Sequence, residues 1–158
     1  MQRAHYAKKT VAGNASRLKV GIAVSKFNSD ITEPMLAATL ETLREWKVSE
    51  RVISIMHVPG SFELPLAASH LIKKKKVDAV IALGCVIKGE TKHDEYISHA
   101  VAHGLTSLML DTGIPIGFGV ITPNTLAQAK ARSRGKANKG SEATIAALSM
   151  ALIVASKE

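Results

Sequence analysis

The 158-residue sequence contains little cysteine, few aromatic residues and no long hydrophobic run. Its single cysteine, Cys85, can form no internal disulfide, so nothing in the sequence points to an oxidising compartment. The longest apolar stretch, residues 79–87, is far shorter than the ~20 residues that a membrane span needs. No apolar segment follows the basic residues near the N-terminus, so no secretory signal is expected. With 46% hydrophobic residues, the sequence predicts a globular cytoplasmic protein with no membrane partner.

Acidic residues are missing from two stretches of the chain, which makes the charge uneven. The sequence has 21 Lys and Arg against 13 Asp and Glu, a net charge of +8. Residues 1–19 and 130–139 contain no acid, and residues 73–76 are consecutive lysines. These clusters hold most of the basic residues, so the rest of the chain is acidic. A strongly basic chain suggests a nucleic-acid partner, but the sequence has no recognition motif and we expect none.

The spacing of apolar residues predicts alternating strands and helices. Short β-branched runs predict strands over residues 18–25, 52–57, 77–83 and 114–121. Three-and-four spacing predicts helices over residues 33–46, 65–75, 95–110, 124–131 and 141–155. Thr32 and Pro34 are the expected start signals of the first helix. Strands that alternate with helices in this way form a parallel sheet, with right-handed crossovers and helices on both faces.

We therefore expect one three-layer α/β/α domain over residues 18–158, built on a four-stranded parallel sheet. Residues 1–17 are basic and lack periodicity, and we expect them to form an arm that contacts other subunits. A four-stranded sheet leaves two open edges, which invite pairing with another chain. The fold class thus predicts an oligomer.

The scarce phenylalanines gather where the strands are expected to end. In open α/β sheets, ligands bind beyond the carboxyl ends of the strands. Phe27, Phe62 and Phe118 lie in or next to the segments that follow strands. Three rings near one rim predict a flat ligand that stacks on them. The alternative is that the rings close the ends of the sheet.

Four kinds of polar group accompany these rings. Glu63 can accept paired hydrogen bonds from a heterocycle, or it can compensate the charge of a helix N-terminus. Among the six histidines, only His93 combines a strand-end loop with an expected helix start, where it can shuttle protons. The amides of residues 89–91 can hold a phosphate that Arg132 or Lys139 completes, although a solvated basic loop also explains those cations. No second ligand stands at metal-binding spacing, so no metal is expected.

Five segments occur in an order and at spacings that are specific when taken together. They are VSKFNSDIT, VPGSFELP, ALGCVIKGETKHDEYIS, PIGFGVITPNTLAQAKAR and NKGSEA. Over about residues 18–150, the chain resembles the 6,7-dimethyl-8-ribityllumazine synthase family. The resemblance implies a flavodoxin-like winding and a cofactor-free condensation of 5-amino-6-(D-ribitylamino)uracil with 3,4-dihydroxy-2-butanone 4-phosphate, the penultimate step to riboflavin. It also implies a homo-oligomer, a pentamer or a larger assembly of the same protomer, with sites shared between subunits.

The resemblance further implies a role for each site residue. His93 matches the proton donor, and Glu90 and Thr91 match the backbone that binds the butanone phosphate. Phe118 and Arg132 match residues that a neighbouring subunit lends to the ring and to the phosphate. Contacts to the pyrimidine and its ribityl chain match Phe27, Asn28, Ser61, Phe62, Glu63, Cys85, Val86 and Ile87, and a further family lysine near the site matches Lys139.

Two residues beside His93 depart from the family pattern. Lys92 replaces a small residue or proline, and Asp94 replaces an aromatic or apolar residue. These departures bear on the rate more than on the reaction. The rival interpretation is a flavodoxin-like module that binds flavin mononucleotide without catalysis. Such a module needs a Ser/Thr/Gly-rich loop after the first strand, where this chain has Lys26, Phe27 and Asn28.

Overall fold

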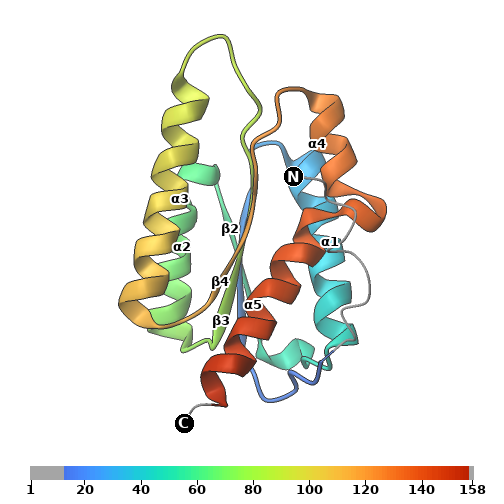
Figure 1. Ribbon diagram of the computed structural model, residues 1–158, viewed down its shortest axis with the longest axis vertical. Coiled ribbons are helices and arrows are strands. Elements are labelled where there is room, and N and C mark those ends of the chain that lie inside the picture. Colours follow the sequence, from blue (N-terminus) through green and yellow to red (C-terminus); the bar gives the residue numbers. More distant parts are fainter. Residues whose placement is uncertain (1–12, 157–158) are drawn as a thin grey trace.

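Four parallel strands form the centre of the protein in the order β2-β1-β3-β4 (Figure 1). The computed structural model describes residues 13–156, so most of the expected basic arm lies outside the described residues. The strands are β1 (Val20–Ser25), β2 (Ile53–Val58), β3 (Ala79–Cys85) and β4 (Ile116–Ile121). This order is that of flavodoxin-like sheets, and it confirms the predicted four-stranded parallel sheet.

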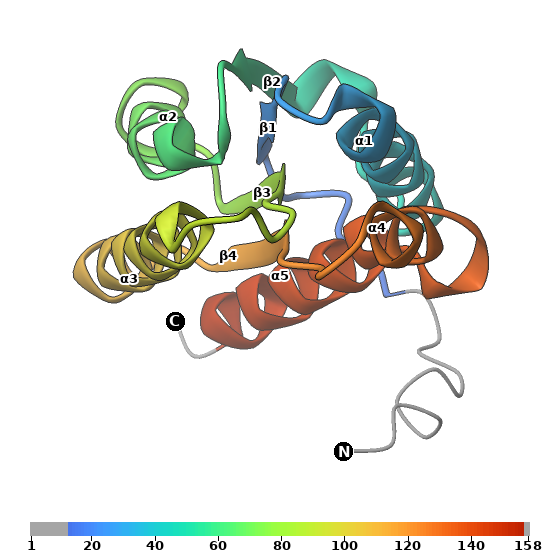
Figure 2. The ribbon, with the colours of Figure 1, turned by 90° about the horizontal axis from the view of Figure 1, so that it is seen from above.

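Five α-helices cover the two faces of the sheet (Figure 2). One face carries α1 (Ser29–Glu45), α4 (Leu126–Ser133) and α5 (Lys139–Ala155). The other carries α2 (Leu64–His70), continued by a π-helical turn η4 (Leu71–Lys75), and α3 (His93–Thr112). The predicted three-layer α/β/α architecture is confirmed. No helix within residues 13–156 is both long enough and apolar enough to cross a membrane.

The central strands are apolar on both faces because each face packs against helices. In β1, the side chains of Val20, Ile22 and Val24 pack toward α1 and α5, whereas Ala23 packs toward α2 and α3. In β3, the side chain of Ile81 also packs toward α1 and α5. Each fully buried side chain of this size stabilises the fold by roughly 1.5–3 kcal/mol. Two cores on one sheet hold the strand ends, and hence the turns that follow them, in fixed positions.

The first helix begins at Ser29 and not at residue 33, so the predicted start signals were wrong. Asn28 adopts the left-handed conformation (φ 59°) and turns the chain directly into the helix. The carbonyl of Asn28 accepts hydrogen bonds from the amides of Ile31 (2.9 Å) and Thr32 (3.1 Å). Pro34 lies inside the helix and has no amide hydrogen to donate to the carbonyl of Asp30. Because Asp30 is exposed, water can donate to that carbonyl instead. The other predicted boundaries agree with the structure to within about two residues, the usual uncertainty of helix ends.

Candidate active site

The turns after β1 and β3 meet at the centre of the carboxyl edge of the sheet. From β1 the chain passes to α1 on one face, and from β3 it passes to α3 on the other. The crevice between two such strands is the usual ligand site of this fold. Asn28 Nδ2 donates a hydrogen bond to the carbonyl of Cys85 (2.9 Å) and joins the two turns. The structure thus brings Phe27 and Asn28 next to the Cys85 segment.

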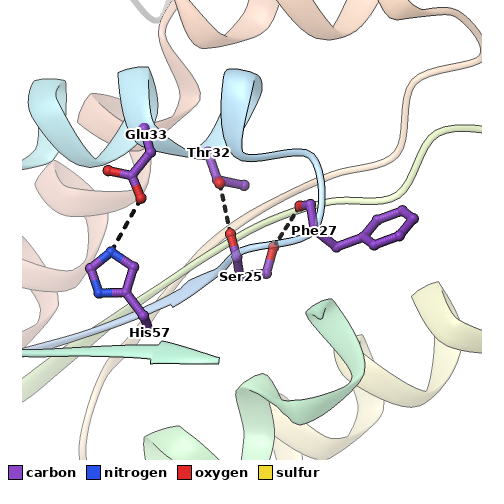
Figure 3. Close-up of polar contacts among 5 residues, drawn as sticks. All are labelled: Ser25, Phe27, Thr32, Glu33 and His57. Carbon is purple, nitrogen blue, oxygen red and sulfur yellow. Dashed lines mark hydrogen bonds and ion pairs between the residues drawn. The ribbon is translucent and has the colours of Figure 1, made fainter. Parts of the chain in front are cut away.

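Phe27 lies on a rigid turn with its ring free (Figure 3). Its amide donates to the carbonyl of Pro59 (3.0 Å), and its carbonyl accepts from Ser25 Oγ (3.3 Å). Thr32 Oγ1 donates to the carbonyl of Ser25 (2.7 Å), and both of these hydroxyl residues are buried. The side chain of Phe27 is 70% exposed, and Figure 3 shows its ring pointing away from these contacts. A fixed backbone with an exposed ring provides a flat surface for stacking.

A second polar contact, between His57 and Glu33, joins β2 to α1 (Figure 3). His57 Nε2 lies 3.1 Å from Glu33 Oε1, and both side chains are partly exposed. Exposed pairs of this kind contribute about 0–1 kcal/mol, so this contact adds little to stability. It has no part in the predicted site.

The turn after β2 contains one free ring, one buried serine and one carboxylate that is engaged in a hydrogen bond. Ser61 is buried, and a side chain on Gly84 of β3 would clash with its hydroxyl. Glu63 Oε2 accepts a hydrogen bond from the amide of Gly60 (2.9 Å), so one carboxylate oxygen stabilises the turn itself. Phe62 is 60% exposed. Of this segment, the ring of Phe62 and the second oxygen of Glu63 are available to a ligand.

The segment between β3 and α3 places His93 at a helix start, as predicted. The His93 amide donates to Thr91 Oγ1 (3.4 Å), and the side chains of Glu90, Thr91 and His93 are exposed. Asp94 Oδ1 accepts from the amide of Gly89 (3.3 Å). The unusual carboxylate therefore points back into the turn expected to bind phosphate, and repels an anion there.

Cys85 contributes its backbone and not its thiol. The side chain is buried, and this burial raises the pKa of the thiol from 9.0 to about 11. The thiol is therefore protonated near neutral pH, and a protonated thiol is a poor nucleophile. Val86 and Ile87 follow directly, and the amide of Val86 bonds to the carbonyl of Ile121 (2.9 Å).

A groove of about 380 Å³ opens beside β4. It is lined by residues 120–124 and by Phe118, Gln128, Arg132 and Lys139. The Arg132 guanidinium donates to the carbonyl of Gln128 (3.1 Å), and the Lys139 ammonium pairs with the Glu142 carboxylate. Two cations beside an aromatic ring suit an anionic ligand such as a phosphate ester.

Phe118 does not lie at the carboxyl edge, so the prediction of three rings near one rim was wrong. It lies within the edge strand β4, opposite Ala82 of β3. A side chain on the preceding residue, Gly117, would clash with the carbonyl of Ala143 in α5. Because side chains alternate along a strand, Phe118 projects from the opposite face of β4, and it is 49% exposed.

The predicted site therefore has two parts within one chain, which adjoin where the amides of Val86 and Lys88 donate to the carbonyls of Ile121 (2.9 Å) and Pro123 (3.0 Å). We call the turns of residues 26–28, 59–63 and 85–93 the rim. We call the pocket lined by Phe118, residues 120–124, Gln128, Arg132 and Lys139 the β4 groove. The strand β3 separates β4 from β1. Neither Gln128, which lines the groove, nor Glu142, which pairs with Lys139, was predicted from the sequence. Gln128 lies four residues before Arg132, and Glu142 lies three residues after Lys139. Residues at these spacings share one face of a helix, so the spacing is the sequence signal for both. Within residues 13–156, no three His, Cys, Asp or Glu side chains group as metal ligands.

The sheet order, the crevice at its carboxyl edge and the cationic groove define a flavodoxin-like α/β protein with a candidate site for small molecules. The family model of 6,7-dimethyl-8-ribityllumazine synthase matches residues 17–155. A protein of that name from Porphyromonas gingivalis is 47% identical over 135 residues, 85% of this chain and 84% of the relative. Another from Phocaeicola vulgatus is 41% identical over 138 residues, 87% of this chain and 82% of the relative. The chain belongs to the 6,7-dimethyl-8-ribityllumazine synthase family.

Proposed function

We propose that this protein condenses 5-amino-6-(D-ribitylamino)uracil with 3,4-dihydroxy-2-butanone 4-phosphate to form 6,7-dimethyl-8-ribityllumazine, with release of phosphate and water. The observation that carries the proposal is family membership over residues 17–155, a span that includes both the rim and the β4 groove. The reaction is the penultimate step of riboflavin biosynthesis. We place it in the cytoplasm, since a chain with one cysteine can form no internal disulfide.

The rim is the proposed site of the pyrimidine. The exposed rings of Phe27 and Phe62 offer stacking surfaces beside the crevice between β1 and β3. Asn28 joins the two turns, and Ser61 and Glu63 form the turn that would contact the ribityl chain. Backbone groups of residues 85–87 complete the set. Aromatic stacking contributes about 0.5–1.5 kcal/mol beyond area burial, enough to orient a heterocycle against fixed polar groups.

His93 is the proposed proton shuttle. Imine formation between an aromatic amine and a ketone, loss of phosphate, and ring closure all require proton transfers. The exposed imidazole stands at the start of α3, next to the turn of Glu90 and Thr91 proposed to hold the butanone phosphate. General acid–base catalysis of this kind contributes about 10²–10⁴-fold. The rest of the rate enhancement comes from holding two substrates in register.

The β4 groove is proposed to serve the rim of a neighbouring subunit. In one chain, Phe118 in β4 lies on the far side of β3 from the turn of Phe27 after β1. Large apolar side chains are exposed on α3 (Tyr96 and Leu110), as is expected of a surface that another copy covers. We therefore propose a homo-oligomer, with a pentamer as the repeating unit, in which each site combines one rim with one groove.

The direct test is to mix the purified protein with both substrates and to follow the fluorescent lumazine. Product above the uncatalysed rate is expected, and its absence would overturn the proposal. Tight retention of flavin mononucleotide without turnover would instead favour the flavodoxin-like module.

Mixing two impaired variants, assayed at a butanone phosphate concentration well below the KM of Arg132→Ala, tests the shared site. Chains carrying His93→Ala keep an intact groove, and chains carrying Arg132→Ala keep an intact rim. If sites are shared, random reassembly of equal amounts restores activity at about a quarter of the sites. Mixtures no more active than the separate variants would place each site within one chain.

A further inference from the structure

The two cations of the β4 groove are joined by a segment with little regular structure. Arg132 is next to the end of α4, and Lys139 is the first residue of α5. Between them the chain makes one 3-10 turn, Gly135–Ala137. The main-chain hydrogen bonds of a continuous helix or strand therefore do not set the separation of the two cationic side chains. Some other contact must hold it.

That contact is the side chain of Asn138, which is 5% exposed. Its Nδ2 donates to the carbonyl of Ser133 (2.6 Å) and to the carbonyl of Pro34 in α1 (3.2 Å). Its Oδ1 accepts from the amide of Gly140 (2.8 Å), which caps α5. Both amide hydrogens and the amide oxygen are thus engaged, in a buried place where an unpaired polar group costs stability.

Each partner of Asn138 adjoins a part of the groove. Ser133 directly follows Arg132, and Gly140 directly follows Lys139. A side chain on Gly140 would clash with the carbonyl of Met35, so the start of α5 lies directly against α1. The bond from Asn138 to Pro34 anchors the same junction to that helix. One amide therefore links the last turn of α4, the first turn of α5 and α1.

We propose that Asn138 is a positioning residue for phosphate recognition: it fixes Arg132 and Lys139 at the separation that the phosphate of the butanone substrate requires. The inference rests on the proposed function. Asn is suited to this task because it supplies two donors and one acceptor, whereas Asp supplies acceptors only. Asn138 itself does not contact the substrate.

The test is steady-state kinetics of Asn138→Asp in the full-length protein, with each substrate varied in turn. The variant keeps an acceptor for the Gly140 amide and loses both donors. We expect KM for the butanone phosphate to rise about tenfold, a change of about 1.4 kcal/mol. KM for the pyrimidine stays within twofold of the wild-type value. If Asn138→Asp does not fold, Asn138→Ser, which also retains a capping oxygen, takes its place.

Thr32→Val is the matched control. It also removes a buried side-chain-to-backbone hydrogen bond, that of Thr32 Oγ1 to Ser25, but next to the rim. We expect its effect to fall on KM for the pyrimidine and not on KM for the butanone phosphate. Equal changes of both KM values in Asn138→Asp, or no change in either, would overturn the inference, because they indicate a purely structural role or none.

A second measurement separates the inference from the proposed function. Inorganic phosphate that binds the groove raises Tm of the native protein by mass action. We expect this shift in the wild-type protein and its loss in Asn138→Asp. If the wild-type protein makes no lumazine but the loss is still seen, the proposed function fails and the positioning role stands. An unchanged phosphate shift in Asn138→Asp contradicts the positioning role whatever the activity.

Discussion

The rim and the two cations of the β4 groove are held in place by different sets of hydrogen bonds. In the rim, main-chain and side-chain groups both join neighbouring turns: the amides of Lys26 and Phe27 donate to the carbonyls of Val58 (2.8 Å) and Pro59 (3.0 Å), and Asn28 Nδ2 donates to the carbonyl of Cys85 (2.9 Å). The segment that carries Arg132 and Lys139 is held mainly by one side chain, that of Asn138. Main-chain bonds tolerate substitution, whereas side-chain bonds are lost with a single replacement.

The two regions also differ in charge. The rim mixes three lysines (Lys26, Lys88 and Lys92) with the carboxylates of Glu63 and Glu90, whereas the residues that line the groove include two cations, Arg132 and Lys139, and no carboxylate. The anionic substrate therefore depends more on the groove than on the rim. Since both are needed at one site, the comparison predicts distinct kinetic effects: variants of the rim side chains Phe27, Phe62 and His93 should alter turnover or pyrimidine binding, and groove variants should alter use of the butanone phosphate.

The largest effect is expected from His93→Ala in the rim. Removal of the proton shuttle lowers kcat by about 10²–10⁴-fold, while KM for the pyrimidine changes little because stacking is retained. Stopped-flow or steady-state lumazine fluorescence measures both. His99→Ala, an exposed histidine on the same helix, is the control and should keep its turnover. Lost pyrimidine binding with unchanged kcat would contradict the role of His93.

A smaller and selective effect is expected from Arg132→Ala in the groove. Loss of a charge-assisted hydrogen bond of about 1.5–3 kcal/mol raises KM for the butanone phosphate by roughly 10–100-fold. Arg134→Ala removes a neighbouring exposed arginine outside the groove and should have little effect. Titration of each substrate in turn separates the two KM values. An effect confined to the pyrimidine would remove the distinction between rim and groove.

A gain is expected from Asp94→Asn. The Asp94 carboxylate accepts from the Gly89 amide at the turn proposed to meet the phosphate, and its charge repels that ligand. Asn can accept the same hydrogen bond without the charge. KM for the butanone phosphate should fall by a few fold, about 0.5–1 kcal/mol, in a salt-dependent manner. A higher KM would show that the carboxylate supports the turn more than it opposes the anion.

The sequence predicted the fold well because its strongest signals are local. β1 and β3 are buried on both faces, so their apolar runs stand out without any alignment. The start of α1 was mispredicted because the left-handed backbone of Asn28, and not a proline, begins that helix. The rim residues were predicted for a similar reason, since a turn after a strand can be read from its neighbours in sequence.

The groove was predicted less well because it depends on contacts between distant residues. Phe118 was placed at the rim, since nothing local shows that its strand lies at an edge against α5. Asn138 lies in a Lys/Gly-rich segment that resembles a solvated loop. Its burial depends on Pro34, which is 104 residues away along the chain. A single polar side chain with a remote partner gives no periodic signal.

The smallest effect is expected from Cys85→Ala, which tests whether the rim depends on main-chain groups. The side-chain Nδ2 of Asn28 donates to the main-chain carbonyl of Cys85, which alanine retains. The values of kcat and of both KM should therefore stay within about twofold. The thiol does affect stability at high pH. Burial raises its pKa from 9.0 to about 11, so the unfolded chain ionises first. The contribution of the buried thiol to the free energy of unfolding is complete below pH 9.0 and is lost as pH rises to about 11. The difference in unfolding free energy between wild type and Cys85→Ala should therefore shrink over this range in urea titrations. A large loss of activity would mean that the thiol, and not the main chain, forms this part of the rim.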